Sequence, residues 1–240
     1  MTPTEAFFTV HRDLPRQGPG MPDDVRWALQ VAGTPDQASI CDAACGTGAD
    51  TVTLAEARPE ATIFAVELAS DFVAATQRRA EELGARVQVE VRDYADLPGE
   101  YDLIWCAGAV YFVGLEAALA NWRTHLQPGG AIAFSEPAWV REPPSSEARA
   151  FWEEYPAICG VDELNRRVAD AGWDVLGQRW MIGAPWKAYY APMKARIAEL
   201  KETIVNDEVV KVIAESEAEI ARWESAQDEI AYVLFVVRPK

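Results

Sequence analysis

Short apolar runs alternate with amphipathic stretches along the chain from about Ser39 onward. The apolar runs predict strands at residues 39–44, 62–68, 86–91, 101–110 and 130–136. The amphipathic stretches between them predict helices at 49–57 and 70–83, and a third that runs through Trp122. Strands this uniformly apolar are typical of a parallel sheet that helices cover on both faces. The pattern therefore predicts a doubly wound α/β fold.

The last third of the chain departs from this regular alternation. It predicts a helix at 162–173, a sixth strand at 173–182 and a final strand at 230–237. Between the last two strands, apolar residues fall at helical spacing in two sets: Met193, Ile197, Leu200 and Ile204, then Val209, Ile213, Ile220 and Trp223. The spacing predicts a two-helix insertion, and insertions of this kind commonly form lids or pockets.

Charge narrows the range of expected partners. The 240 residues include 22 basic and 38 acidic side chains, for a net charge of −16. A surface this acidic repels the phosphates of nucleic acids and anionic lipids, so neither is an expected partner. The apolar stretch from Leu103 to Leu115 is too short to cross a bilayer, and the first residues lack the basic start and apolar run of a signal peptide. We expect a cytoplasmic protein.

The cysteines predict neither disulfides nor a metal site. Cys41, Cys45, Cys106 and Cys159 form no C-x-x-C pair, and the chain has only 2 histidines. So few ligand residues do not predict a zinc site, and free cysteines are most often buried thiols. We therefore expect reduced cysteines and no bound metal.

The loop after the first predicted strand, "DAACGTGAD" from Asp42 to Asp50, is the candidate binding site. Ligands of open α/β sheets bind beyond the carboxyl ends of the strands. Gly46 and Gly48 would let the backbone approach a ligand, and the helix that follows offers unpaired N–H groups. The dinucleotide pattern G-x-G-x-x-G would need a third glycine where Thr51 stands. The carboxylate of Asp42 suits a positively charged ligand better than a pyrophosphate.

This loop resembles the D-x-G-x-G-x-G loop of class I S-adenosylmethionine-dependent methyltransferases, with Ala44 in place of the first glycine. The resemblance continues in order along the chain. Glu67, with Leu68 beside it, matches the acid that holds the ribose hydroxyls. Asp93, with Tyr94 beside it, matches the acid that takes the adenine amino group. The segments "YDLIWCAGAVYF", with Cys106 and Ala107, and "LQPGGAIAFSE" match the methyl-transfer motif and the turn and strand after it.

The resemblance implies a Rossmann-like, seven-stranded, doubly wound sheet whose last strand is antiparallel. It implies one methyltransferase domain over 1–240, with an N-terminal cap at 1–35 and a cofactor-binding core at 36–138. Substrate-side elements, lid helices and the last two strands would occupy 139–240. Outside the core, "DLPRQGPG" and the aromatic segments after Ser135 resemble an uncharacterised bacterial subgroup, related to the C-methyltransferases of ubiquinone biosynthesis.

The implied cofactor is S-adenosylmethionine, and the implied reaction is in-line displacement at its sulfonium methyl group, for which alignment supplies most of the rate. Asp42 and the loop amides would orient the methionine amine and carboxylate. Arg16 or Gln17 could fold over the cofactor and bind that carboxylate. The alternative is that the "RQGPG" segment is only a turn.

Three residues are candidates for a general base, should the acceptor need one. Glu136 ends the fifth strand, Tyr111 follows the fourth, and His11 lies on the N-terminal arm. Purely structural roles remain the alternative for Glu136 and His11, because most such residues are not catalytic.

Aromatic residues gather in the part of the chain expected to overhang the fourth and fifth strands. Six of them are candidates for a substrate pocket: Trp139, Trp152, Tyr155, Trp186, Tyr189 and Tyr190. A pocket of this kind would suit a flat or apolar molecule or stabilise the sulfonium by cation–π contact. Each could instead be a core residue, and we assign Trp180 and Trp223 to the core.

The sequence thus predicts methyl transfer from S-adenosylmethionine to a small apolar or aromatic molecule. Two alternatives stay open: an NAD(P)-dependent oxidoreductase, and a protein that binds S-adenosylmethionine without transferring the methyl group. The sequence does not decide between a monomer and a homodimer.

Overall fold

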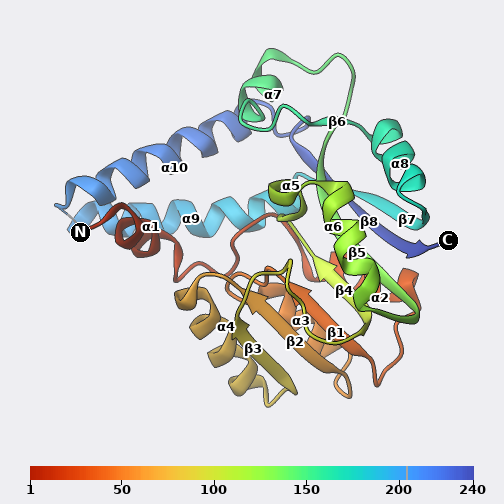
Figure 1. Ribbon diagram of the computed structural model, residues 1–240. Coiled ribbons are helices and arrows are strands. Elements are labelled where there is room, and N and C mark those ends of the chain that lie inside the picture. The colour runs from red at the N-terminus through yellow and green to blue at the C-terminus, as the bar shows by residue number, and fades with distance from the viewer. Residues whose placement is uncertain (204) are drawn as a thin grey trace.

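A computed structural model describes residues 1–203 and 205–240, with a mixed sheet at the centre (Figure 1). In these residues the strand order is β3-β2-β1-β4-β5-β8-β7, and a short β6 pairs with the end of β5. The bounds are β1 Ser39–Ala43, β2 Thr62–Glu67, β3 Val87–Val91, β4 Tyr101–Cys106, β5 Leu126–Trp139, β6 Cys159–Gly160, β7 Trp173–Ile182 and β8 Ala231–Pro239.

The sheet confirms the predicted doubly wound α/β fold. Strands β1 to β5 pair in parallel, whereas β8 lies between β5 and β7 and pairs with both in the antiparallel sense. The order turns back at β1, between β2 and β4, which is where a sheet of this kind binds its ligand. The sequence did not predict β6, because two residues are too few to form an apolar run.

Helices cover both faces of the sheet. They are α2 Pro22–Ala32, α3 Ala49–Ala57, α4 Ser70–Leu83, α5 Val110–Val113, α6 Leu115–Trp122, α7 Ser146–Phe151 and α8 Val161–Asp170, with a 3₁₀ turn at Arg123–His125. The helix predicted to run through Trp122 is broken at Gly114, whose φ of 90° no helix allows. None of the described helices is long and apolar enough to cross a bilayer.

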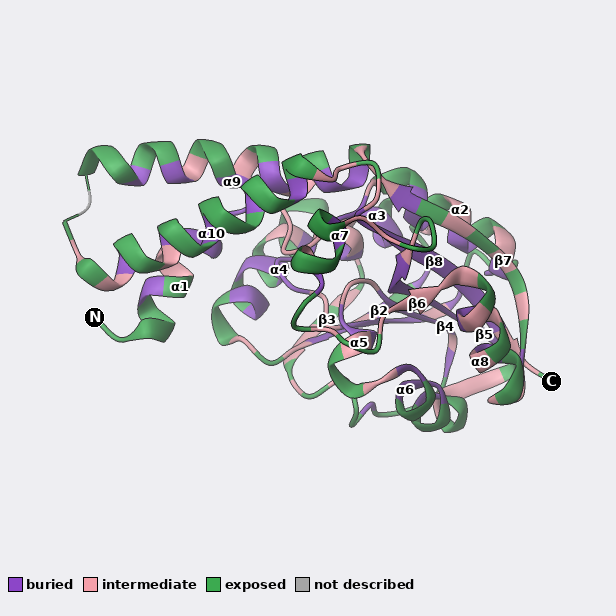
Figure 2. Cartoon of the chain, turned by 90° about the horizontal axis from the view of Figure 1, so that it is seen from above, coloured by how far each residue is buried: buried purple, intermediate pink, exposed green. Residues whose placement is uncertain are grey.

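The predicted two-helix insertion is present between β7 and β8 as α9 (Ala184–Thr203) and α10 (Asp207–Ser225). The two helices extend together away from the sheet, and α1 (Pro3–His11) packs against both near their far end (Figure 1). Their buried residues form stripes (Figure 2), which include Met193, Ile197 and Leu200 of α9 and Val209, Ile213, Ile220 and Trp223 of α10. Ile204 lies outside the described residues.

The two tryptophans assigned to the core have different outcomes. Trp223 is buried, as predicted, but Trp180 is 37% exposed, so that assignment was wrong. Trp180 lies on β7, an edge strand whose residues alternate between more and less buried positions, and Trp180 and Leu176 fall on its exposed positions. Cys41 and Cys106 are buried, Cys45 and Cys159 are partly buried, and all four are free thiols.

Candidate functional site

A cavity of about 360 Å³ lies where β1, β2 and β4 end, at the point where the strand order turns back. We call it the central cavity. Nine of the predicted cofactor residues line it: Arg16, Gln17, Asp42, Ala44, Gly46, Glu67, Leu68, Tyr94 and Ala107. Gly48, Asp93 and Cys106 do not form part of its lining. The volume falls in the usual range for small-molecule sites.

The loop after β1 keeps the backbone conformation of a glycine-rich loop even where glycine is missing. Ala44 has a φ of 63°, and in the described part of the chain it is the one non-glycine residue with a positive φ. A Cβ on Gly46 would lie 3.3 Å from the side chain of Gln17, and one on Gly48 would lie 2.8 Å from the Thr76 side chain. Packing therefore excludes a side chain at Gly48, whereas at Gly46 a side chain would displace Gln17 slightly; both glycines also have a positive φ, of 82° and 54°.

Asp42 is held in place behind the loop. Its side chain is almost fully buried, and its Oδ2 accepts a hydrogen bond from Thr51 Oγ1 at 2.5 Å. Burial raises the pKa of Asp42 to about 8, against the smaller opposing effect of the Thr51 hydrogen bond. Thr51, which stands where a dinucleotide fold would have glycine, therefore supports this carboxylate.

Glu67 ties the loop to the end of β2. Its Oε2 accepts a hydrogen bond from the Gly46 amide at 3.1 Å, and its Oε1 accepts one from the Ala69 amide at 3.0 Å. Each carboxylate oxygen has a second lone pair, so Glu67 can also accept hydroxyl protons from a ligand in the central cavity.

Tyr94, rather than Asp93, forms the wall at the end of β3. The Tyr94 hydroxyl donates to the Ala109 carbonyl oxygen at 3.3 Å, and burial raises the pKa of this phenol to about 12. Asp93 is exposed, and its Oδ1 accepts from the Ala95 amide at 2.8 Å. Its predicted role in binding adenine therefore stays a prediction.

The segment from Arg12 to Met21, here called the strap, covers one side of the central cavity. The Thr47 hydroxyl donates to the Leu14 carbonyl at 3.2 Å, and Arg79 donates to the carbonyls of Pro15 and Thr47 at 2.7 and 2.6 Å. These bonds fasten the strap to the loop after β1. Arg16 and Gln17 consequently face the cavity, as expected if the strap folds over a ligand.

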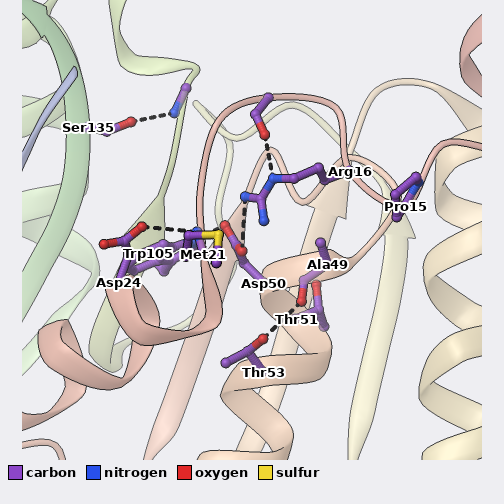
Figure 3. A network of polar contacts seen from close by, with 12 residues as sticks. Pro15, Arg16, Met21, Asp24, Ala49, Asp50, Thr51, Thr53, Trp105 and Ser135 are labelled. Atoms are coloured by element: carbon purple, nitrogen blue, oxygen red, sulfur yellow. Dashed lines mark hydrogen bonds and ion pairs between the residues drawn. The ribbon is translucent and has the colours of Figure 1, made fainter. Parts of the chain in front are cut away.

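Sequence reasoning missed Asp50 and Trp105, which also line the cavity. Asp50 Oδ1 lies 3.3 Å from Arg16 Nη2, and its Oδ2 accepts from Trp105 Nε1 at 3.2 Å (Figure 3). The first turn of a helix commonly carries an acid for reasons of helix stability alone, so Asp50 gave no distinct signal. Trp105 lies inside an apolar strand and gave none either.

Glu136 is the most buried of the three base candidates, with no exposed surface. Its Oε1 accepts a hydrogen bond from the Tyr155 hydroxyl at 2.5 Å, while Oε2 has no hydrogen-bond partner within the described structure. Burial raises the pKa of Glu136 to about 7. Tyr111, on α5, places its ring centroid 5.5 Å from that of Tyr155, so these two candidates lie in one cluster.

His11 is the last residue of α1 and does not line the central cavity. Its ring stacks on Phe7 with the centroids 4.1 Å apart, and burial lowers its pKa to about 4. Its backbone carbonyl accepts from Gln17 Nε2 at 2.7 Å. His11 is therefore linked to the cavity through Gln17 of the strap, and its imidazole ring does not line the cavity.

Five of the six predicted pocket aromatics gather in one region. Tyr232 of β8 joins them: its ring centroid lies 5.8 Å from that of Trp152 and 5.1 Å from that of Trp186. The Trp186 ring lies beside that of Tyr190, which lies beside that of Tyr189. The Tyr111 ring lies between those of Tyr155 and Tyr232. Trp139 lies apart from these rings, in a separate hollow beside α8.

Tyr232 also connects this aromatic cluster to the central cavity. A Cβ built on Gly108, which lines the cavity, would lie 4.0 Å from Tyr232 Cε2. Sequence reasoning missed Tyr232, because it is one apolar residue among many in a buried strand. The cluster and the cavity therefore share a wall where β4 ends and β8 begins.

Comparison with known proteins agrees with this geometry. Residues 40–130 match the model of a family described as "Methyltransferase domain". This segment runs from Ile40 in β1 through β4 into β5. It contains Asp42 at the end of β1, Glu67 at the end of β2 and Tyr94 after β3. Over this segment, the family match agrees with the predicted resemblance to class I S-adenosylmethionine-dependent methyltransferases.

Two solved structures share the fold over nearly the whole chain. One is a SAM-dependent methyltransferase from Geobacter sulfurreducens in complex with S-adenosyl-L-homocysteine, with a TM-score of 0.88, 20% identity and coverage of 98% of each chain. The other, from Thiobacillus denitrificans in complex with the same compound, has a TM-score of 0.87, 19% identity and again 98% coverage of each chain. At these identities the likeness is one of fold.

Among curated relatives, the chain is similar to the trans-aconitate 2-methyltransferase of Deinococcus radiodurans. They are 31% identical over 102 residues, which cover 42% of this chain and 38% of that protein. The matched segments span from 24% to 54% of the length of the curated relatives. The expected kinship with ubiquinone-biosynthesis enzymes stays a prediction.

Proposed function

We propose that the protein transfers a methyl group from S-adenosylmethionine to a small apolar or aromatic acceptor. The observation that carries the proposal is the central cavity, in which the glycine loop, Glu67 and the strap meet where the strand order turns back. The aromatic cluster that shares the wall at Gly108 supports an apolar acceptor.

The cavity's residues fit a nucleoside that carries a charged end. Leu68, Phe72, Tyr94 and Phe112 supply apolar and aromatic surface, which suits a purine base. Glu67 keeps acceptor capacity for sugar hydroxyls, and Asp50 and Arg16 supply charge of both signs. A pyrophosphate would instead meet the carboxylates of Asp50 and Glu67 in the cavity, which counts against the NAD(P)-dependent alternative.

When bound, S-adenosylmethionine supplies an electrophilic methyl carbon on a sulfonium centre. The chain's own contribution is position, because alignment of the reacting groups supplies most of the rate. In the proposal, Glu67 accepts the ribose hydroxyls and Asp93, at the rim, accepts the adenine amino group. Gly46 and Ala44 let the backbone come close to the ligand, and Leu68 and Ala107 shape the wall, whereas Gly48 and Cys106 would act only by supporting these neighbours.

An acceptor that must lose a proton would use Glu136 through Tyr155. The Tyr155 hydroxyl is only half-buried and donates to Glu136 Oε1, so it can receive a proton from a ligand while it passes its own to the carboxylate. Tyr111 lies beside it as a second phenol, and Trp152, Trp186, Tyr189 and Tyr190 would enclose the acceptor. His11 and Trp139 lie farther from this region and are the weakest of the candidates.

The first test is binding. Calorimetric titration should show affinity for S-adenosylhomocysteine and none for NADH, and Glu67→Ala should lose most of that affinity. Asp93→Ala tests the adenine role separately. Binding of NADH alone would overturn the proposal in favour of an oxidoreductase.

The second test is transfer. Tritiated S-adenosylmethionine, incubated with pools of phenols, amines and apolar small acids, should label a product that Glu67→Ala fails to form. Binding of S-adenosylhomocysteine by a protein that labels nothing would favour the non-catalytic alternative.

The same proposal includes a division of the chain into an N-terminal cap, a cofactor-binding core and substrate-side elements. It also includes a cytoplasmic location.

A further inference from the structure

A partly buried ion pair lies in the wall of the central cavity. Arg16 Nη2 and Asp50 Oδ1 are 3.3 Å apart, and their side chains are 12% and 13% exposed (Figure 3). Both residues line the cavity. A charge pair in this position can offer its remaining donors and lone pairs to a ligand.

Both partners are fixed before any ligand arrives. The Arg16 Nε donates to the Gly18 carbonyl at 2.5 Å, which holds the guanidinium against the strap. The Trp105 indole N–H donates to Asp50 Oδ2 at 3.2 Å, and Trp105 is itself buried. The two charges thus come from the strap and from the first turn of α3, and each has a second anchor.

Asp42 is less available than Asp50 to a ligand cation. It is 2% exposed, and Thr51 uses one of its oxygens. Burial favours its protonated form, since it raises the pKa of this carboxyl to about 8. The carboxylate that stands beside a cation on the cavity wall is that of Asp50.

We infer that Asp50 and Arg16 form a two-charge subsite for the α-amino acid end of the cofactor, in which Asp50 accepts from the ammonium and Arg16 donates to the carboxylate. The inference rests on the proposed function and assigns the ammonium to a different acid from Asp42. A zwitterion placed on this pair makes a ring of four alternating charges, in which each ion has two neighbours of opposite sign. Such charge-assisted hydrogen bonds are stronger than neutral ones.

The experiment compares ligands that differ only at this end. S-Adenosylhomocysteine carries both charges, and 5′-methylthioadenosine carries neither. The analogue without the carboxylate keeps the ammonium, and the analogue without the amine keeps the carboxylate. Dissociation constants for all four are measured by calorimetry with the full chain, Asp50→Asn, Arg16→Gln and the control Glu56→Gln, an exposed acid on the same helix α3.

Asp50→Asn should weaken the two ammonium-bearing ligands by roughly 10- to 100-fold, the range for loss of a charge-assisted hydrogen bond. It should weaken 5′-methylthioadenosine and the analogue without the amine by less than about threefold, within the context-dependence of such effects. Arg16→Gln should instead weaken the two ligands that carry a carboxylate, and Glu56→Gln should weaken none.

Equal weakening of all four ligands by Asp50→Asn would show that Asp50 only holds the strap, and would overturn the inference. So would an Asp50→Asn variant that binds every ligand as the unchanged protein does. Failure of the unchanged protein to bind S-adenosylhomocysteine at all would instead sink the proposed function. If Asp50→Asn does not fold, as judged by thermal unfolding, Asp50→Ser keeps a polar group beside Trp105 and takes its place with the same expectations.

Discussion

Glu136 Oε1 accepts a hydrogen bond from the Tyr155 hydroxyl at 2.5 Å, and the pair joins the end of β5 to the segment after α7. The bond connects two residues that the sequence assigned to different roles, one as a base and the other as part of a substrate pocket. A carboxylate with no exposed surface, and with one oxygen that has no partner among the described residues, is costly to ionise. The pair should therefore be visible in how stability depends on pH.

Glu136 should make the protein less stable as pH rises from about 4.5 to about 7. Burial raises its pKa to about 7, so in this window the folded protein holds a proton that the unfolded chain has released, and stability falls with pH. Glu136→Gln should remove a loss on the order of 2 kcal/mol, measured as the difference in urea unfolding between pH 5 and pH 8. Glu153→Gln, an exposed acid in the adjoining segment, is the control.

Glu136→Gln should still lose some stability as pH rises, because burial also raises the pKa of Asp42, to about 8. Identical pH profiles for Glu136→Gln and the unchanged protein would contradict the prediction for Glu136.

His11 should make the protein more stable as pH rises, the opposite of Glu136, and should do so at lower pH. Burial lowers its pKa from the ordinary 6.5 to about 4, so the unfolded chain binds a proton before the folded protein does. Its contribution is complete above about pH 6.5 and is lost as pH falls toward 4. His11→Phe, which keeps an aromatic ring beside Phe7, should flatten the acid side of a plot of melting temperature against pH. An unchanged acid limb would contradict the assignment, and His125→Gln is the control.

Ala44→Gly should stabilise the protein. The left-handed conformation of Ala44, with a φ of 63°, costs a non-glycine residue about 1–2 kcal/mol. Glycine relieves that strain but has more freedom to lose on folding, so we expect a net gain of up to about 1 kcal/mol in unfolding free energy. Chemical denaturation measures it directly.

The matched control is Ala74→Gly, at an exposed position of α4. The same change should cost about 1 kcal/mol there, because the backbone is helical. A loss of stability at both positions would show that the Ala44 methyl group packs favourably enough to outweigh its strain.

The sequence predicted the sheet because its strands are buried on both faces and therefore apolar throughout. It placed Asp42, Gly46 and Glu67 at the cavity because residues at strand ends meet at one edge of a parallel sheet. It wrongly assigned Trp180 to the core because Trp180 stands next to the apolar residues Met181 and Ile182, which hide the alternation of buried and exposed positions along β7. A stronger signal went unused: Thr2 and Glu5 form a capping box with Pro3 at the helix start, which marks α1.

Residues that act only through tertiary neighbours gave no comparable signal. Asp50 matters because Arg16, which is 34 positions earlier in the chain, lies opposite it. Tyr232 matters because Gly108 leaves room beside its ring. Periodicity and spacing describe a residue's own element, and both of these pairings come from how separate elements pack.

The strap determines which fragments of this protein keep a complete central cavity. A fragment limited to residues 40–130, the span of the family match, would retain Asp42, Glu67 and Tyr94. It would lack the guanidinium of Arg16 and the covering side chain of Gln17, and Arg79 would lose its carbonyl partner on Pro15. Such a piece would leave Asp50 without its cation and would remove the residues of β5 from Ala131 onward that pair with β4, so ligand studies need the chain on both sides of the matched span.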